Sequence, residues 1–100
     1  HHNQAQKLQL KSAARSLSET LWQLETPDDV RLFLEDLCTP AELQALADRW
    51  VVVGLLQRDM PYREINRQTG VSVTTIGRVA RYLAAGNGGY ALAARRLKER

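Results

Sequence analysis

The sequence predicts an all-α fold of about six helices that includes a helix-turn-helix. Three observations support this class. Apolar side chains recur with the spacing of amphipathic helices, whereas no segment alternates apolar and polar residues as a strand does. Thr-Pro pairs mark the starts of two helices, and glycines mark two corners between helices. A chain of 100 residues is expected to form one small domain with a modest core.

The N-terminal region predicts a long amphipathic helix. We interpret residues 1–3, which include His1 and His2, as the remnant of an expression tag, and residues 4–100 as a single domain. The stretch from Gln4 to Leu24 is rich in good helix formers. Its apolar stripe consists of Leu8, Leu10, Ala14, Leu17, Leu21 and Trp22. The stripe can pack against a second copy of the chain or into a core within one chain.

Two Thr-Pro pairs predict the next two helices. Thr26 is expected to cap a helix with Pro27 at its first position, and this helix is expected to lie mostly in the core. Its apolar residues are Val30, Leu32, Phe33, Leu34 and Leu37. Thr39 and Glu42 are expected to form a capping box for a third helix that ends near Gln57. Because this third helix is apolar on more than one face, we expect it to be the central helix.

A turn at residues 69–72 predicts a helix-turn-helix at about residues 61–84. Gly70 can adopt the positive φ that ends one helix, and Ser72 can cap the next one. In the second helix, helical spacing directs four residues inward: Ile76, Val79, Ala80 and Leu83. The residues expected to face outward or sideways are Val73, Thr74, Gly77, Arg78 and Arg81. Short side chains followed by arginines suit the major groove of DNA, although a purely structural helical hairpin can contain the same turn.

The C-terminal region predicts a glycine corner and a last helix. Several glycines follow Ala85 and are expected to form a flexible corner. The last helix is expected to run from Tyr90 to about Arg100, with Leu92, Ala93 and Leu97 facing inward.

Positive charge is concentrated in the part of the chain that contains the turn. Residues 1–57 carry five Lys/Arg and eight Asp/Glu, a net charge of −3, whereas residues 58–100 carry nine and three, a net charge of +6. A positive field over one end of a small domain is typical of a phosphate-binding surface. The charge distribution therefore favours a nucleic acid as the partner.

The composition argues against several other classes of protein. No stretch is long and apolar enough for a membrane span, no secretory leader is expected, and the single Cys38 excludes an intrachain disulfide. We therefore expect a cytoplasmic protein without a membrane partner. Apart from His1 and His2 the chain has no histidine, so we expect neither catalytic residues nor a metal site, and no enzyme activity.

Three segments of the chain resemble the Trp repressor superfamily, most closely its YerC/YecD-like branch of regulators. They are LEDLCTPAELQALADRW, YREINRQTGVSVTTIGRV and YLAAGNGGYALAARRLKER, within roughly residues 28–100. The resemblance implies an intertwined, all-helical homodimer that binds double-stranded DNA. It also implies a sequence-specific transcriptional regulator, a repressor in the type member, that reads a palindromic operator with two helix-turn-helix units.

The resemblance assigns eight residues to the DNA interface. Arg63 matches a family arginine that reaches a base edge, and Thr75 matches a hydroxyl close to ligand and phosphate. Asn66 stands where Trp repressor has a lysine. The expected DNA-binding residues are Arg63, Asn66, Val73, Thr74, Thr75, Gly77, Arg78 and Arg81.

The same resemblance implies an effector pocket formed by Thr39, Arg49, Arg78 and Val79. Arg49 and Arg78 match the two arginines that flank the indole of tryptophan in Trp repressor, although Arg49 can equally be a surface arginine. Val79 replaces a glycine against which the ligand packs, and its branched Cβ would intrude on an indole. The sequence therefore argues against tryptophan as corepressor, predicts no definite cofactor and leaves another small-molecule effector open.

The main alternative is a different kind of helical module. In that interpretation the turn is structural, and the chain is a protein-interaction module or a non-specific nucleic-acid-associated module whose basic half binds anions loosely. The two hypotheses differ in sequence preference, since a regulator should prefer its site to random DNA by ~10³-fold or more.

Overall fold

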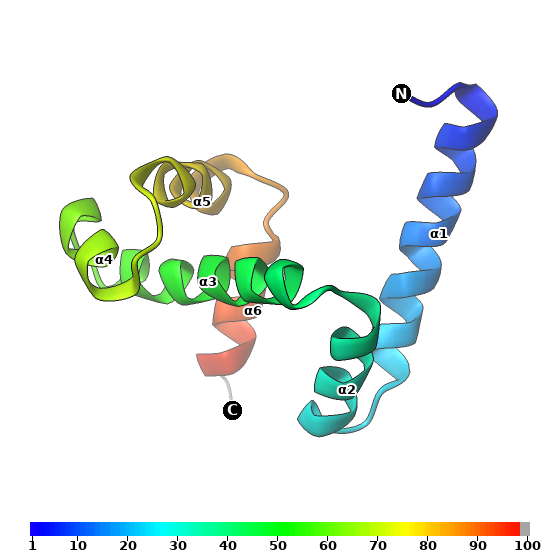
Figure 1. The fold of residues 1–100 in the computed structure, drawn as a ribbon, viewed down its shortest axis with the longest axis horizontal. Helices are drawn as coiled ribbons and strands as arrows, with labels where there is room; N and C mark the ends of the chain where they lie inside the picture. Colours follow the sequence, from blue (N-terminus) through cyan, green and yellow to red (C-terminus); the bar gives the residue numbers. More distant parts are fainter. Residues whose placement is uncertain (99–100) are drawn as a thin grey trace. The chain divides into compact units, whose positions relative to one another are not determined.

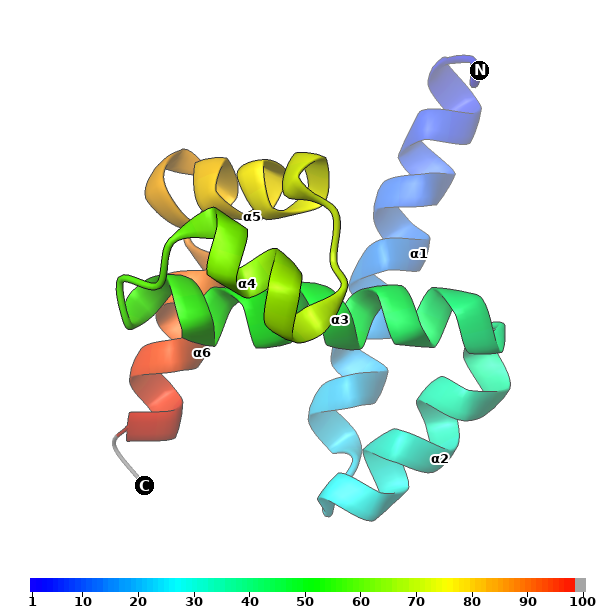
Figure 2. The same cartoon turned by 60° about the vertical axis from the view of Figure 1, so that its left-hand side comes forward.

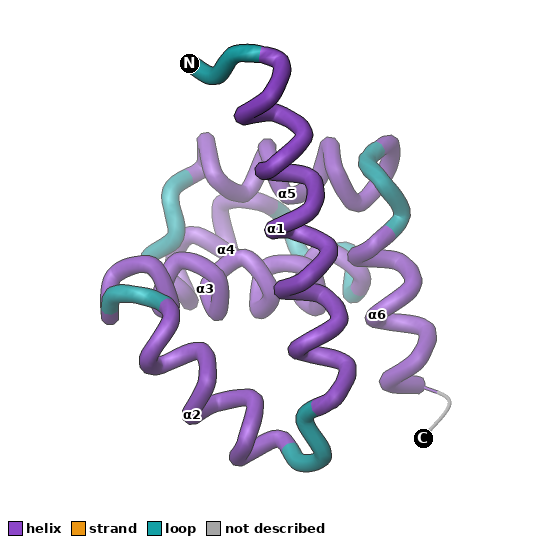
Figure 3. The backbone as a smooth tube through the Cα atoms, turned by 90° about the vertical axis from the view of Figure 1, so that its right-hand side faces the viewer, coloured by secondary structure: helices purple, strands orange, loops and turns teal. Residues whose placement is uncertain are grey.

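The computed structural model describes residues 1–98, and every regular element in that range is an α-helix (Figure 3). The six helices are α1 (Gln4–Gln23), α2 (Pro27–Leu37), α3 (Pro40–Gln57), α4 (Tyr62–Thr69), α5 (Val73–Ala85) and α6 (Gly89–Lys98). The predicted all-α class and the order of the helices are therefore confirmed. The predicted helix end at Arg100 lies outside the described residues.

The chain divides into two compact units, His1–Thr39 and Pro40–Arg100. The first unit contains α1 and α2. At the start of α1, the Asn3 carboxamide accepts a hydrogen bond from the Gln6 N–H at 2.9 Å, and the Asn3 N–H donates to Gln6 Oε1 at 2.9 Å. Asn3, which we grouped with the tag remnant, thus forms a capping box with Gln6. The box satisfies the backbone N–H groups of both residues at this helix end.

No residue of α1 is buried, although the helix carries the predicted apolar stripe. Trp22 is 84% exposed, and Leu8, Leu10 and Leu17 are exposed as well. Within its own unit, therefore, α1 buries none of this stripe. An exposed apolar stripe of this length is typical of a helix that packs against another chain.

The start of α2 follows the prediction, but its burial does not. Thr26 Oγ1 accepts a hydrogen bond from the Asp29 N–H at 3.1 Å, and Pro27 occupies the first helical position. The expectation that this helix lies mostly in the core is wrong, because none of its residues is buried and Leu37 is 52% exposed. A unit of only two helices does not provide enough neighbouring surface to bury the apolar faces of both.

The core of the second unit is formed by α3, α4 and α5. Its buried residues are Val52, Val53, Ile65, Val71, Ile76 and Val79. Figures 1 and 2 show α4 and α5 lying over α3, and α3 contacts both of them. Within this unit α5 contacts α3, α4 and α6, so α5 is the central helix rather than the predicted α3. The helix-turn-helix packs on the C-terminal half of α3, which carries the buried Val52 and Val53.

The direction in which α6 faces differs from the prediction. Leu92 is 45% exposed and Leu97 is exposed, so the expected inward stripe of Leu92, Ala93 and Leu97 is wrong. Tyr90 packs against the core instead, and Ala94 is half-buried. Leu97, near the end of α6, borders a hollow together with Trp50 and the core residue Val53 of α3, so it lies beside the core without being covered by it. At Gly86 a Cβ would lie 2.5 Å from the Tyr82 carbonyl oxygen, so the corner before α6 requires a glycine.

Candidate DNA-binding surface

The turn between α4 and α5 has the geometry that the sequence predicts. Gly70 ends α4 with φ +74° and ψ 0°, and its N–H donates to the Asn66 carbonyl at 2.8 Å. This left-handed conformation favours glycine. Ser72 Oγ then caps α5 by accepting a hydrogen bond from the Thr75 N–H at 3.1 Å. The two helices are therefore joined by a short turn with hydrogen bonds at both helix ends.

Two side chains fix the turn further, and the sequence analysis did not assign this role to them. The Thr69 hydroxyl donates to the Ile65 carbonyl at 2.7 Å and accepts from the Val71 N–H at 3.1 Å. Asn66 Nδ2 donates to the Val71 carbonyl at 2.8 Å. The signal in the sequence was the presence of two hydrogen-bonding side chains, Asn66 and Thr69, shortly before the turn glycine Gly70. Asn66, an expected DNA contact, thus also supports the turn with its carboxamide.

The outward face of α4 carries two arginines. Ile65 is fully buried, whereas Arg63 and Arg67 are both exposed. Positions 63 and 67 are one helical turn apart and lie roughly opposite Ile65 around the helix. Arg63 therefore lies on the exposed face, as its predicted role requires, and Arg67 lies beside it.

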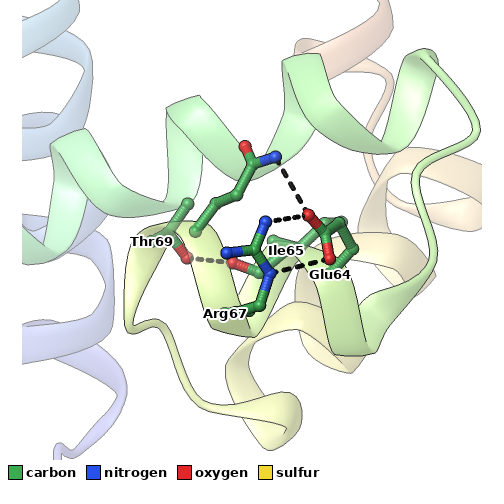
Figure 4. Close-up of polar contacts among 5 residues, drawn as sticks. Glu64, Ile65, Arg67 and Thr69 are labelled. Atoms are coloured by element: carbon green, nitrogen blue, oxygen red, sulfur yellow. Dashed lines mark hydrogen bonds and ion pairs between the residues drawn. The ribbon is translucent and has the colours of Figure 1, made fainter.

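A carboxylate on α4 accepts several hydrogen bonds (Figure 4). Arg67 Nε donates to Glu64 Oε2 at 2.9 Å, Arg67 Nη2 donates to Glu64 Oε1, and Gln68 Nε2 donates to Oε1 at 3.3 Å. The hydrogen bonds from Arg67 lower the pKa of Glu64, and the same pairing raises the pKa of Arg67. Both groups are therefore charged at neutral pH.

The second helix of the motif separates a buried face from an exposed face. Ile76 and Val79 are buried, and Ala80 and Leu83 are half-buried. The opposite face presents Val73, Thr74, Arg78 and Arg81 to solvent. Gly77 is half-buried on this face, and a Cβ added there would meet no atom within 4 Å. The start of α5 is thus lined by small side chains, with arginines one to two turns further along.

Thr75 has a structural partner at the start of α5. Its hydroxyl accepts a hydrogen bond from Ser72 Oγ at 3.0 Å, while its N–H donates to the same Ser72 oxygen. The residue is half-buried. Thr75 therefore belongs to the cap of α5, with its hydroxyl hydrogen left for an acceptor outside the cap.

The Arg78 side chain lies over the ring of Tyr82, one helical turn further along α5. Its guanidinium carbon lies 4.4 Å from the centre of the Tyr82 ring, a cation-π distance. The two side chains border a hollow of about 300 Å³, whose other lining residues among those described are Asn87, Gly89 and Tyr90. The sequence analysis did not single out Tyr82 for this role, although its i, i+4 spacing from Arg78 was the available signal.

The residues of the expected effector pocket lie in different surroundings. Val79 is 1% exposed and belongs to the core of the second unit, whereas Arg49 is half-buried on α3. Thr39 belongs to the first unit. Arg78 is the member of this set that borders the hollow beside Tyr82.

The described part of the chain offers no group of three or more His, Cys, Asp or Glu residues placed to hold a metal ion. Among the same residues, no helix combines the length and the apolar character that a membrane span requires.

The chain is similar to proteins of one family. The family described as Trp repressor protein matches residues 12–98. A Bacillus subtilis (strain 168) protein, YerC, described as uncharacterized, is 39% identical over 83 residues, which cover 83% of this chain and 80% of that protein.

Two crystal structures extend this similarity to the fold. A TrpR-like protein from Eubacterium eligens ATCC 27750 is 36% identical with a TM-score of 0.82, and the match covers 87% of this chain and 90% of that one. A candidate Trp repressor from Staphylococcus aureus is 32% identical with a TM-score of 0.83, and the match covers 97% and 96% of the two chains.

Proposed function

The chain belongs to the Trp repressor family, and from that premise we propose that it is a sequence-specific DNA-binding transcriptional regulator. It acts in the cytoplasm as a homodimer that reads a palindromic operator, and it acts as a repressor rather than an enzyme. Each subunit inserts the N-terminal part of α5 into a major groove, while α4 crosses the sugar-phosphate backbone.

One observation carries this proposal, namely the composition of the exposed face of α5. At the start of the helix this face carries Val73, Thr74 and the open position Gly77. Short side chains allow the helix backbone to approach base edges closely. Arg81 lies one turn beyond Gly77 on the same face, where it can reach a phosphate or a guanine. A helix kept exposed only for solubility does not require this order of small and basic residues.

The hydrogen-bonded turn supports the same function. A reading helix must keep a fixed angle to the helix that contacts the backbone, since base contacts depend on orientation. Gly70, Asn66, Thr69 and Ser72 hold that angle through hydrogen bonds within the motif. The motif therefore needs no ligand to form its turn.

The exposed apolar stripe of α1 supports the homodimer. Leu8, Leu10, Leu17 and Trp22 are exposed in the single chain, and a second copy of α1 and α2 is the surface that can cover them. Dimeric helix-turn-helix proteins place their two reading helices roughly 34–36 Å apart, one turn of B-DNA. The proposed operator therefore has two half-sites at that spacing.

The experiment that tests the proposal is selection of DNA from a random pool at near-physiological salt, without added ligand. We expect enrichment of a palindrome with half-sites about one helical turn apart. The same selection with Arg63→Ala serves as a control, and it should lose preference at one base pair of each half-site. Loose binding without an enriched sequence, with and without pooled metabolites, would instead support the non-specific module.

Tryptophan is tested separately as an effector. Because Val79 is buried in the core where the family has a glycine facing the ligand, we expect added tryptophan to leave operator affinity unchanged. Titration of the operator with and without tryptophan measures this directly. A tenfold gain in affinity with tryptophan would contradict the assignment of Val79.

A further inference from the structure

Arg67 lies on the exposed face of α4 and has no role in the proposed DNA contacts so far. Its side chain is 69% exposed, and it lies one helical turn after Arg63. Both arginines lie roughly opposite the buried Ile65, so they share the face that points away from the core. In a helix-turn-helix bound to DNA, the first helix crosses the backbone. On this face Arg63 has a proposed base contact, and Arg67, one turn later, is placed where it can reach a phosphate.

Glu64 determines which edge of the Arg67 guanidinium is available. The carboxylate accepts hydrogen bonds from Nε and Nη2 of Arg67, and Gln68 donates to the same carboxylate (Figure 4). These contacts use one edge of the guanidinium, whereas arginine has five N–H donors in a rigid plane. In the described range of the chain, Nη1 has no protein acceptor. The Nη1 edge is therefore left for an acceptor from outside the protein.

We propose that Arg67 is a phosphate contact on α4, with Glu64 holding its guanidinium so that the Nη1 edge meets the DNA backbone. This inference rests on the proposed function. A planar guanidinium can bind a carboxylate along one edge and a phosphate oxygen along another at the same time. The paired carboxylate carries its charge next to a positive group, which reduces its repulsion of the DNA.

The first test is Arg67→Gln, with Arg31→Gln as its matched control. Arg31 is also exposed, is paired with Glu35 at 2.9 Å in an i, i+4 arrangement, and lies on α2 outside the motif. Affinities for the selected operator and for a random duplex are measured over a range of salt concentrations. We expect Arg67→Gln to weaken both complexes by roughly tenfold and to reduce the salt slope by about one unit per bound subunit. The sequence preferred by Arg67→Gln should be that of the wild type. The affinity and salt slope of Arg31→Gln should equal those of the wild type.

The second test exchanges the two residues, combining Glu64→Arg with Arg67→Glu. This double variant keeps the net charge and the i, i+3 pair but moves the positive charge to another position around α4. If Arg67 is a phosphate contact, the exchange weakens binding at least as much as Arg67→Gln. Wild-type affinity and salt slope in the exchanged protein, with helix content verified by circular dichroism, would overturn the proposal and leave only the general positive field.

The outcomes separate this inference from the proposed function. A wild-type protein that selects an operator, together with an Arg67→Gln variant of unchanged affinity and slope, contradicts the role of Arg67 alone. A wild-type protein without sequence preference contradicts the proposed function. In that case weaker, less salt-dependent binding by Arg67→Gln still supports the phosphate contact.

Discussion

Replacing Gly77 with alanine should change stability and DNA binding in opposite directions. Gly77 lies inside α5, where alanine is favoured over glycine by about 0.8–1.0 kcal/mol. The added Cβ would meet no heavy atom within 4 Å, so no steric cost offsets this gain. For a domain of this size, about 1 kcal/mol corresponds to a rise in Tm of roughly 4–8 °C.

The same methyl group would project from the face of α5 that we propose to enter the major groove. A Cβ at Gly77 would point into empty space beside the helix. In the complex, the methyl group would therefore keep the helix backbone away from the base edges. We expect specific binding to weaken by about 1–3 kcal/mol, the usual cost of one mismatched base pair. Thermal unfolding at fixed protein concentration and titration of the selected operator measure the two effects.

Gly54→Ala provides the control for this experiment. Gly54 lies in α3, outside the turn, and a Cβ added there would also meet no atom within 4 Å. It should raise Tm by a similar amount and leave operator affinity unchanged. Equal affinity of Gly77→Ala and the wild type for the operator would refute the proposal that Gly77 lies at the closest approach to DNA. A fall in Tm would refute the reasoning on stability.

Three further changes test other parts of the proposed interface. Arg63→Ala should weaken specific binding by about 1–3 kcal/mol and relax preference at one base pair per half-site, and an unchanged preference in a selection would count against a base contact. Arg81→Ala should lower affinity evenly across sequences and flatten the salt slope by about one unit, whereas a loss on one sequence alone would indicate a base contact. Deletion of residues 1–24 should give a monomer in analytical ultracentrifugation, because α1 buries none of its apolar stripe within the chain, and a stable dimer without it would rule out this use of the stripe.

The helix-turn-helix could be predicted because its determinants are local. Gly70 and Ser72 stand two residues apart, and each fixes one helix end by its own conformation or hydrogen bond. The inward face of α5 was equally predictable from the spacing of Ile76 and Val79. Such features depend on the chain within one or two turns, so the sequence alone determines them.

The burial of α2 and α6 could not be predicted in the same way. Periodicity shows that Leu37 and Leu92 belong to apolar or amphipathic helices, but it does not show which neighbour covers them. That information depends on the direction of a corner or on a surface outside the single chain. The pairing of Glu64 with Arg67 was missed for a different reason, since oppositely charged residues at i, i+3 are common on helices and rarely have functional meaning.

The position of the core along the chain has a consequence for how the protein folds. Among the described residues, the six that are buried all lie between Val52 and Val79, within one continuous segment. Helical proteins with contacts between nearby residues have low contact order and fold in microseconds to milliseconds. The core of the second unit therefore needs only residues of that unit, including Leu83 and Tyr90, which pack against it. The surface proposed to read DNA would then be complete before any encounter with a second subunit.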